Sequence, residues 1–187
     1  MKHLYNKAFF DWFVPHRHLY QPVADWITHH LSPDVVLDLG CGNGFFLDMI
    51  DCVACLGVEY TDAAMDAIPA RIVKQRHDLT QPLHLEMMFD LVICTEVGEH
   101  LPPVAAPTLV DSIVRHAFKW VLFSAATPGQ GGEGHLNEQP QSYWVDLFAD
   151  RGFWPQWKHT ELVRAAAPTE LSWIRSNALV LSKDFVR

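Results

Sequence analysis

An acidic residue followed by three alternating glycines is the pattern in this chain with the clearest chemical meaning. These residues are Asp38, Gly40, Gly42 and Gly44, and Glu59 follows 19 positions after the first glycine. Glycines at alternate positions let the backbone turn sharply and let a ligand approach closely, because no Cβ lies in the way. A carboxylate at the end of the next strand can accept hydrogen bonds from both hydroxyls of a ribose. The spacing therefore predicts a binding site for a nucleoside.

A second group of reactive side chains lies further along the chain and comprises Glu96, Glu99, His100 and His135. An imidazole titrates near neutral pH and can remove the proton of an acceptor hydroxyl. We therefore expect His100 or His135 to act as a base, with Glu99 beside them as the third catalytic candidate. The run E-x-x-E-H could instead only orient the helix that follows it, and the sequence leaves both interpretations open.

The same four side chains could also hold a metal ion. Two carboxylates and two imidazoles are mixed oxygen and nitrogen ligands, which suit Mg²⁺, Mn²⁺ or Fe²⁺. We do not favour a metal from the sequence, because His135 comes from a separate segment and sequence spacing does not bring it to the others. If a metal is present, its expected ligands are Glu96, Glu99, His100 and His135.

The segments around these residues alternate between strand and helix patterns. Apolar runs that end in turn residues are typical of buried parallel strands. We expect strands over 35–39, 53–58, 71–76, 88–94 and 119–125, helices over 45–50, 61–68, 105–116 and 140–150, and an antiparallel pair of strands over 153–159 and 174–182. In a doubly wound sheet, the ends of the strands at 35–39 and 88–94 flank the position where ligands bind. Both groups of reactive residues should therefore meet at one edge of the sheet.

Residues 1–30 are expected to form a helical cap over that edge. Aromatic and apolar residues recur there at helical spacing, and Pro15 is expected to divide the segment into two helical pieces. Four polar or aromatic residues near this break could face the mouth of the site or lie in a solvated turn; they are His16, Arg17, His18 and Tyr20. The glycine-rich segment 126–136 is expected to form a mobile loop at the same edge.

Composition limits the class of protein. The 187 residues are 49% hydrophobic, which fits one globular domain over 1–187 with no linker or repeat. The net charge of −8 disfavours a broad nucleic-acid-binding surface. No apolar run has the length of a membrane span, and the first residues lack a signal-peptide pattern. The four cysteines, Cys41, Cys52, Cys55 and Cys94, lack a second C-x-x-C pair for zinc, so we expect reduced thiols and a cytoplasmic protein.

The glycine pattern resembles motif I of class I S-adenosylmethionine methyltransferases, D-x-G-x-G-x-G, at all four defining positions. The resemblance implies a Rossmann-like, doubly wound α/β fold, a seven-stranded sheet in the order 3-2-1-4-5-7-6 with the last strand antiparallel. The cofactor of that family is a sulfonium that carries no phosphate, and it would suit the acidic residue Asp38. The segments EVGEHLP and GGEGHLNEQ resemble a bacterial set of short methyltransferase-domain proteins, which indicates the reaction class without fixing the substrate.

The resemblance also implies which residues bind the cofactor. Asp78 would accept a hydrogen bond from the adenine amino group, and the backbone N–H of Leu79 would meet a ring nitrogen. The full implied set is Asp38, Gly40, Cys41, Gly42, Gly44, Glu59, Tyr60, Asp78, Leu79 and Thr95.

We therefore expect transfer of a methyl group from S-adenosylmethionine to a small polar acceptor, with O-methylation of a metabolite or glycan favoured. One alternative is a metal-dependent RNA 3′-end 2′-O-methyltransferase, because the two-Glu, two-His set resembles the metal site of that family. Another is a non-catalytic protein of the same fold that only binds the cofactor or a partner. Four aromatic residues could shape the acceptor pocket or belong to the core, namely Trp12, Phe45, Tyr143 and Trp144. The oligomeric state is not indicated.

Overall fold

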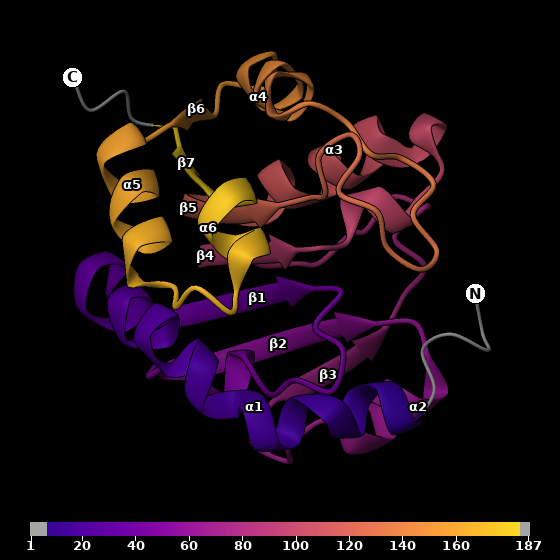
Figure 1. Cartoon of the computed structure of the whole chain (residues 1–187), viewed down its shortest axis with the longest axis vertical. Coiled ribbons are helices and arrows are strands. Elements are labelled where there is room, and N and C mark those ends of the chain that lie inside the picture. Colours follow the sequence, from indigo (N-terminus) through magenta and orange to yellow (C-terminus); the bar gives the residue numbers. More distant parts are fainter. Residues whose placement is uncertain (1–6, 184–187) are drawn as a thin grey trace.

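Seven strands form one sheet through the centre of the computed structural model, which describes residues 7–183 (Figure 1). The strands are β1 (Val35–Leu39), β2 (Ala54–Glu59), β3 (Val73–Arg76), β4 (Phe89–Thr95), β5 (Ala117–Ser124), β6 (Trp154–Pro155) and β7 (Leu179–Ser182). Their order is β3-β2-β1-β4-β5-β7-β6, and β7 pairs antiparallel with both of its neighbours while all other pairs are parallel. The expected fold class and strand order are confirmed.

Helices cover both faces of the sheet because successive strand residues point to opposite sides. Val36, Leu91 and Leu122 pack in one hydrophobic cluster with residues of α1 (Lys7–Trp26), α5 (Trp157–Ala166) and α6 (Ser172–Asn177). The neighbouring strand residues pack on the opposite face with α3 (Ala106–His116) and α4 (Gln141–Ala149). Apart from the turn that follows α1, the other helical elements are α2 (Asp62–Ala67) and the short turns η2 (Leu47–Met49), η3 (Gly98–His100) and η4 (Pro103–Ala105).

The N-terminal segment differs from the expectation of two helical pieces. Helix α1 continues through Pro15 and Pro22 and passes directly into a π-helical turn, η1 (Ile27–Leu31). A proline removes one helical hydrogen bond, but the buried side chains of α1, including Tyr20 and Val23, lie against the sheet and keep the helix in one piece. Residues 1–6 of the predicted cap lie outside the described residues.

The C-terminal strand predictions are right in pairing but wrong in length. Only Trp154 and Pro155 of the predicted strand 153–159 pair with β7, and α5 begins at Trp157. Proline has no N–H for a strand ladder, so the strand cannot continue past it easily. The first residues of the predicted strand 174–182 belong to α6 instead. Likewise, 45–50 holds only the turn η2, and β3 starts at Val73 rather than at residue 71.

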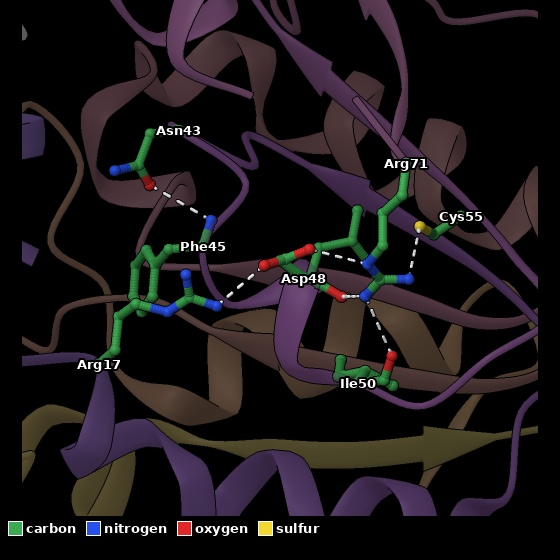
Figure 2. A network of polar contacts seen from close by, with 8 residues as sticks. Arg17, Asn43, Phe45, Asp48, Ile50, Cys55 and Arg71 are labelled. Atoms are coloured by element: carbon green, nitrogen blue, oxygen red, sulfur yellow. Dashed lines mark hydrogen bonds and ion pairs between the residues drawn. The ribbon is translucent and has the colours of Figure 1, made fainter. Parts of the chain in front are cut away.

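A polar network fixes α1 beside the turn that follows β1. Figure 2 shows Asp48 between the guanidinium groups of Arg17, from α1, and Arg71, which precedes β3. Asp48 accepts hydrogen bonds from Arg17 Nη2 at 2.9 Å and from Arg71 Nε at 2.8 Å. Arg71 also donates to the backbone carbonyls of Leu47 and Ile50 at 2.9 and 3.2 Å. Three segments that are distant in sequence are therefore held together next to the glycine turn.

Within residues 7–183, no helix combines the length and the apolar character that crossing a lipid bilayer requires.

Candidate cofactor and acceptor site

The turn after β1 depends on its glycines for backbone geometry. Gly40, Gly42 and Gly44 have φ angles of 80°, 55° and 73°, a region that other residues rarely adopt. A Cβ on Gly40 would lie 2.4 Å from Val97 Cγ2, and one on Gly42 would lie 3.1 Å from Phe10 Cε1. The turn is therefore packed between α1 and the segment that follows β4, and larger residues would not fit there.

Glu59 ends β2 directly beside this turn. Its Oε2 accepts a hydrogen bond from the N–H of Gly42 at 3.1 Å. Its Oε1 accepts three, from the N–H groups of Tyr60 and Thr61 at 2.7 and 2.8 Å and from the Thr61 hydroxyl at 3.1 Å. Because Oε2 accepts only this one hydrogen bond from the described residues, it keeps capacity for a further donor such as a sugar hydroxyl. The carboxylate is thus fixed in orientation at the predicted nucleoside site.

Asp38 carries the charge beneath the turn. Its side chain is only 4% exposed. Burial and, secondarily, the charge of Glu59 raise the pKa of Asp38 to about 8. Burial and the same two carboxylates also raise the pKa of the Cys41 thiol. A cation bound here would favour the ionised form of Asp38, so the local charge suits a sulfonium better than a phosphate.

The other predicted cofactor residues surround the same edge. Asp78 is exposed, and its Oδ1 accepts hydrogen bonds from the N–H and hydroxyl of Thr80 at 2.9 and 2.8 Å, so in this structure it forms a local turn. The N–H of His77 donates to the Glu59 carbonyl at 3.1 Å, which places this turn next to the end of β2. Leu79 is buried and Tyr60 is 48% exposed. The part played by these residues in binding a cofactor stays a prediction.

Glu96 follows β4 in an unusual conformation. Thr95 is the last residue of β4 and pairs with Ser124 of β5. Glu96 has a φ of 54°, and its N–H donates to both the carbonyl and the hydroxyl of Ser124, at 3.0 and 3.2 Å. Its Oε1 is buried and has no hydrogen-bond partner among the described residues. A left-handed non-glycine residue is strained, and such strain is often found at functional sites.

Glu99 is the most deeply buried acidic residue of the site, with a relative exposure of 0%. Neither carboxylate oxygen has a hydrogen-bond partner within the described chain. Burial and the nearby charge of Glu96 raise the pKa of Glu99 to about 8. Its backbone carbonyl accepts the N–H groups of Leu136 and Asn137 at 2.7 and 3.0 Å, which fastens the glycine-rich loop onto η3.

That attachment brings the two predicted histidines together. The rings of His100 and His135 meet edge to face with their centroids 4.9 Å apart. One nitrogen of each, together with a carboxylate oxygen of Glu99, forms a set of atoms that all lie within 4.8 Å of one another. Burial lowers the pKa of His100, and its Nδ1 lies 3.3 Å from the Gly134 carbonyl. The structure therefore unites the three predicted catalytic residues, and Glu96 lies at the margin of this group.

Glu138 was not predicted from the sequence. Its carboxylate accepts hydrogen bonds from the N–H groups of Gly129 and Gly131, each at 2.8 Å, and it lies 2.8 Å from His135 Nδ1. These contacts, with His135 first, hold the pKa of Glu138 below its usual range. The H-x-x-E spacing within a glycine-rich segment was the one available sequence signal. Glu138 therefore orients His135 and organises the loop.

Of the four N-terminal candidates, Tyr20 turns toward the site. It is buried against Phe45, and burial together with the charge of Glu96 raises the pKa of its hydroxyl. Arg17 instead bonds Asp48, and His18 is exposed with Nδ1 3.1 Å from the Pro15 carbonyl. Helix α1 thus contacts the glycine turn through Phe10 and approaches the end of β4 through Tyr20.

The candidate pocket aromatics belong largely to the core. Trp144 is 1% exposed and its ring packs on Gly98 and Phe123. Phe45 stacks on Phe13 at a centroid distance of 5.1 Å. Tyr143 is partly buried against the same core, and the side chain of Trp12 lies outside the described residues. All four cysteines carry free thiols.

Comparison with known proteins places this arrangement in a family. A family model described as a methyltransferase domain matches residues 16–167. The ubiquinone biosynthesis O-methyltransferase of Albidiferax ferrireducens is 30% identical over 178 residues, which cover 84% of this chain and 65% of that protein. The protein of the same name from Pseudomonas fluorescens (strain Pf-5) is 27% identical over 186 residues, covering 87% of this chain and 72% of that protein. The chain thus spans about two thirds of the length of these relatives.

Solved structures show the same fold. The sugar N-methyltransferase KedS8 from Streptoalloteichus sp superposes with a TM-score of 0.71 at 16% identity, covering 93% of this chain and 92% of that one. Magnesium protoporphyrin IX methyltransferase from Synechocystis, with bound S-adenosylhomocysteine, gives a TM-score of 0.65 at 16% identity, covering 91% and 84%. The family match over most of the chain, the glycine turn and the strand order together show that this chain belongs to the family of class I S-adenosylmethionine-dependent methyltransferases.

Proposed function

We propose that this protein transfers the methyl group of S-adenosylmethionine to an oxygen atom of a small polar molecule. The observation that supports the proposal is that two buried acidic groups, Asp38 of β1 and Glu99 after the neighbouring β4, lie at one sheet edge. The Cys94 thiol lies near both groups: burial raises its pKa most, and the charges of Asp38 and Glu99 raise it further. The nucleoside end of the cofactor would lie along Glu59 and the glycine turn, with the sulfonium near Asp38. The methyl group would then point toward Glu99 and the histidine pair.

Positioning would supply most of the catalysis. Methyl transfer requires the acceptor oxygen in line with the breaking carbon–sulfur bond, so holding the two reactants together gives a large acceleration. The acceptor hydroxyl must also lose its proton, and the group formed by Glu99, His100 and His135 lies where that proton would be released. The O-methyltransferase names of the curated relatives support an oxygen acceptor. The negative net charge argues against RNA as the substrate.

Two sets of measurements test the proposal. Calorimetry should show binding of S-adenosylhomocysteine to the full chain, and Glu59→Ala should weaken it. Methyl-labelled S-adenosylmethionine should then transfer label to a small-molecule fraction of a bacterial extract, with total RNA and total protein as parallel fractions. Label on RNA alone would favour the 2′-O-methyltransferase alternative. Binding without transfer to any fraction would indicate a non-catalytic cofactor-binding protein. The free thiols support a reducing compartment such as the cytoplasm.

A further inference from the structure

The carboxylate of Glu99 lacks the partners that a buried acid normally has. It is 0% exposed, and neither oxygen receives a hydrogen bond from the described residues. Oε1 of Glu96 is also buried and has no hydrogen-bond partner in the part of the chain that the structure describes. Among the ion pairs of the described residues, none joins a lysine or an arginine to Glu96 or Glu99. Burying an ionised carboxylate without a compensating charge is very costly, so a bound cation would stabilise the ionised form of these side chains, and the described residues supply none.

Two imidazoles complete a ligand set around Glu99. A nitrogen of His100 and a nitrogen of His135 lie within 4.8 Å of a Glu99 oxygen and of each other. Ligand atoms at about 2 Å from one ion lie within about 4 Å of one another, so at most a small inward movement of these side chains would close the set around an ion. One carboxylate and two histidines are ligands typical of first-row divalent metals, whereas Ca²⁺ and Mg²⁺ prefer oxygen atoms.

The contacts of the outer nitrogens also fit a metal site. His135 Nδ1 lies 2.8 Å from the Glu138 carboxylate and His100 Nδ1 lies 3.3 Å from a backbone carbonyl. Both oxygens accept hydrogen bonds, so each Nδ1 carries the hydrogen and the lone pair of each ring is on Nε2. Metal-binding histidines commonly donate their second nitrogen to a carboxylate or carbonyl in this way, which fixes the ring orientation.

We propose that Glu99, His100 and His135 bind one divalent transition-metal ion, such as Mn²⁺, Co²⁺ or Zn²⁺, with Glu96 as an additional carboxylate at the margin. Its use in catalysis rests on the proposed function. The ion would bind the acceptor hydroxyl and lower its pKa, so that its proton leaves to solvent. The oxygen would then form a bond to the methyl carbon as the carbon–sulfur bond breaks, and S-adenosylhomocysteine would leave as a neutral thioether.

Binding can be measured without any methyl acceptor. The full chain is treated with chelator, exchanged into metal-free buffer, and titrated with Mn²⁺ while electron paramagnetic resonance reports the free ion. We expect one equivalent to bind. Glu99→Gln and His135→Ala should each weaken binding by at least about 100-fold, and Glu138→Gln should weaken it by about 10- to 100-fold because His135 loses its orienting contact. The matched controls are Glu133→Gln, an exposed glutamate of the same loop, and His29→Ala, an exposed histidine of η1. Both should bind as the unchanged protein does.

The outcomes separate the metal from the methyl transfer. Thermal unfolding of each variant shows that it is folded, and Mn²⁺ should raise the melting temperature of the unchanged protein but not of Glu99→Gln. Absence of stoichiometric binding, or equal losses in Glu133→Gln and Glu138→Gln, would overturn the metal site. Full methylation by chelated protein would reject the catalytic use of the ion and leave the proposed function standing. Tight Mn²⁺ binding in a protein that methylates no acceptor would keep the metal site and reject the proposed function.

Discussion

Glu59 and Glu99 lie at the same edge of the sheet but have opposite surroundings. The carboxylate of Glu59 accepts four hydrogen bonds from the residues of the surrounding turns. The carboxylate of Glu99 accepts no hydrogen bond from the described residues. A carboxylate held by backbone amides is fixed in orientation, which suits recognition of neutral hydroxyls. A buried carboxylate without donors is instead suited to a cation. The difference indicates that one site is complete in the free protein and the other is not.

The largest expected effect tests the complete site. Glu59→Ala removes the acceptor for the sugar hydroxyls and also the bond to Gly42. Hydrogen bonds to a charged group contribute about 1.5–3 kcal/mol each, so we expect the dissociation constant for S-adenosylhomocysteine to rise at least about 100-fold in calorimetry. Asp62→Ala, an exposed acid three residues away, serves as the control and should bind normally. Unchanged affinity in Glu59→Ala would remove the basis for the nucleoside site.

The same substitution at the two glutamates should change stability in opposite directions. Glu59→Gln loses charge-assisted hydrogen bonds and should lower the free energy of unfolding by about 1–3 kcal/mol. At about pH 9, above the pKa of about 8 that burial gives Glu99, Glu99→Gln removes a buried charge that has no partner among the described residues, and it should raise the free energy of unfolding by a similar amount in metal-free protein. Urea unfolding in the presence of chelator measures both. If both variants are destabilised, Glu99 has a partner in solution and the comparison fails.

The third prediction tests the raised pKa of Asp38, which lies beneath the glycine turn. The pKa of Asp38 is about 8 in the folded protein and near 3.8 when unfolded. Between these values the folded state retains a proton that the unfolded state releases, so stability falls as pH rises toward 8. The difference in unfolding free energy between Asp38→Asn and the unchanged protein should therefore shift in favour of the variant by more than about 1 kcal/mol from pH 5 to pH 8.5. A flat difference over that range would contradict the raised pKa.

The smallest effect is expected at the docking of α1. The ion pair between Arg17 and Asp48 joins side chains that are 42% and 21% exposed, so Arg17→Ala should cost less than about 1 kcal/mol. Arg71→Ala should cost more, because it also removes bonds to two backbone carbonyls (Figure 2). Thermal unfolding of the two variants ranks them. Equal losses would show that the helix, and not the turn, is what the network stabilises.

Local signals explain which parts of the fold the sequence predicted. Strand β1 is an apolar run, and the turn after it has positive φ angles that glycine adopts far more readily than other residues. Both elements were therefore placed correctly from the sequence. Pro15 gave a local signal for a break, but tertiary packing of α1 overrides it. At 153–159 the apolar pattern predicted one strand, but the strand is limited to Trp154 and Pro155 and α5 begins at Trp157.

The candidate site was predicted in composition but not in geometry. Glu99, His100 and His135 were named from their residue types, whereas their approach depends on the loop folding back onto the carbonyl of Glu99. Nothing in the spacing alone specifies that return. Glu138 was missed for the same reason, because a carboxylate in a glycine-rich segment gains its function only from the amides that the folded loop presents to it.

Helix α1 contacts the glycine turn through Phe10 and lies near Glu96, which follows β4, through Tyr20. A nucleoside bound between the glycine turn and Glu96 would be covered by this helix. S-adenosylhomocysteine could then leave only after α1 moves away from the site, and the rate of its release would depend on how fast the helix undocks. Stopped-flow release of S-adenosylhomocysteine should be faster in Arg17→Ala than in the unchanged protein, even where their equilibrium affinities are similar.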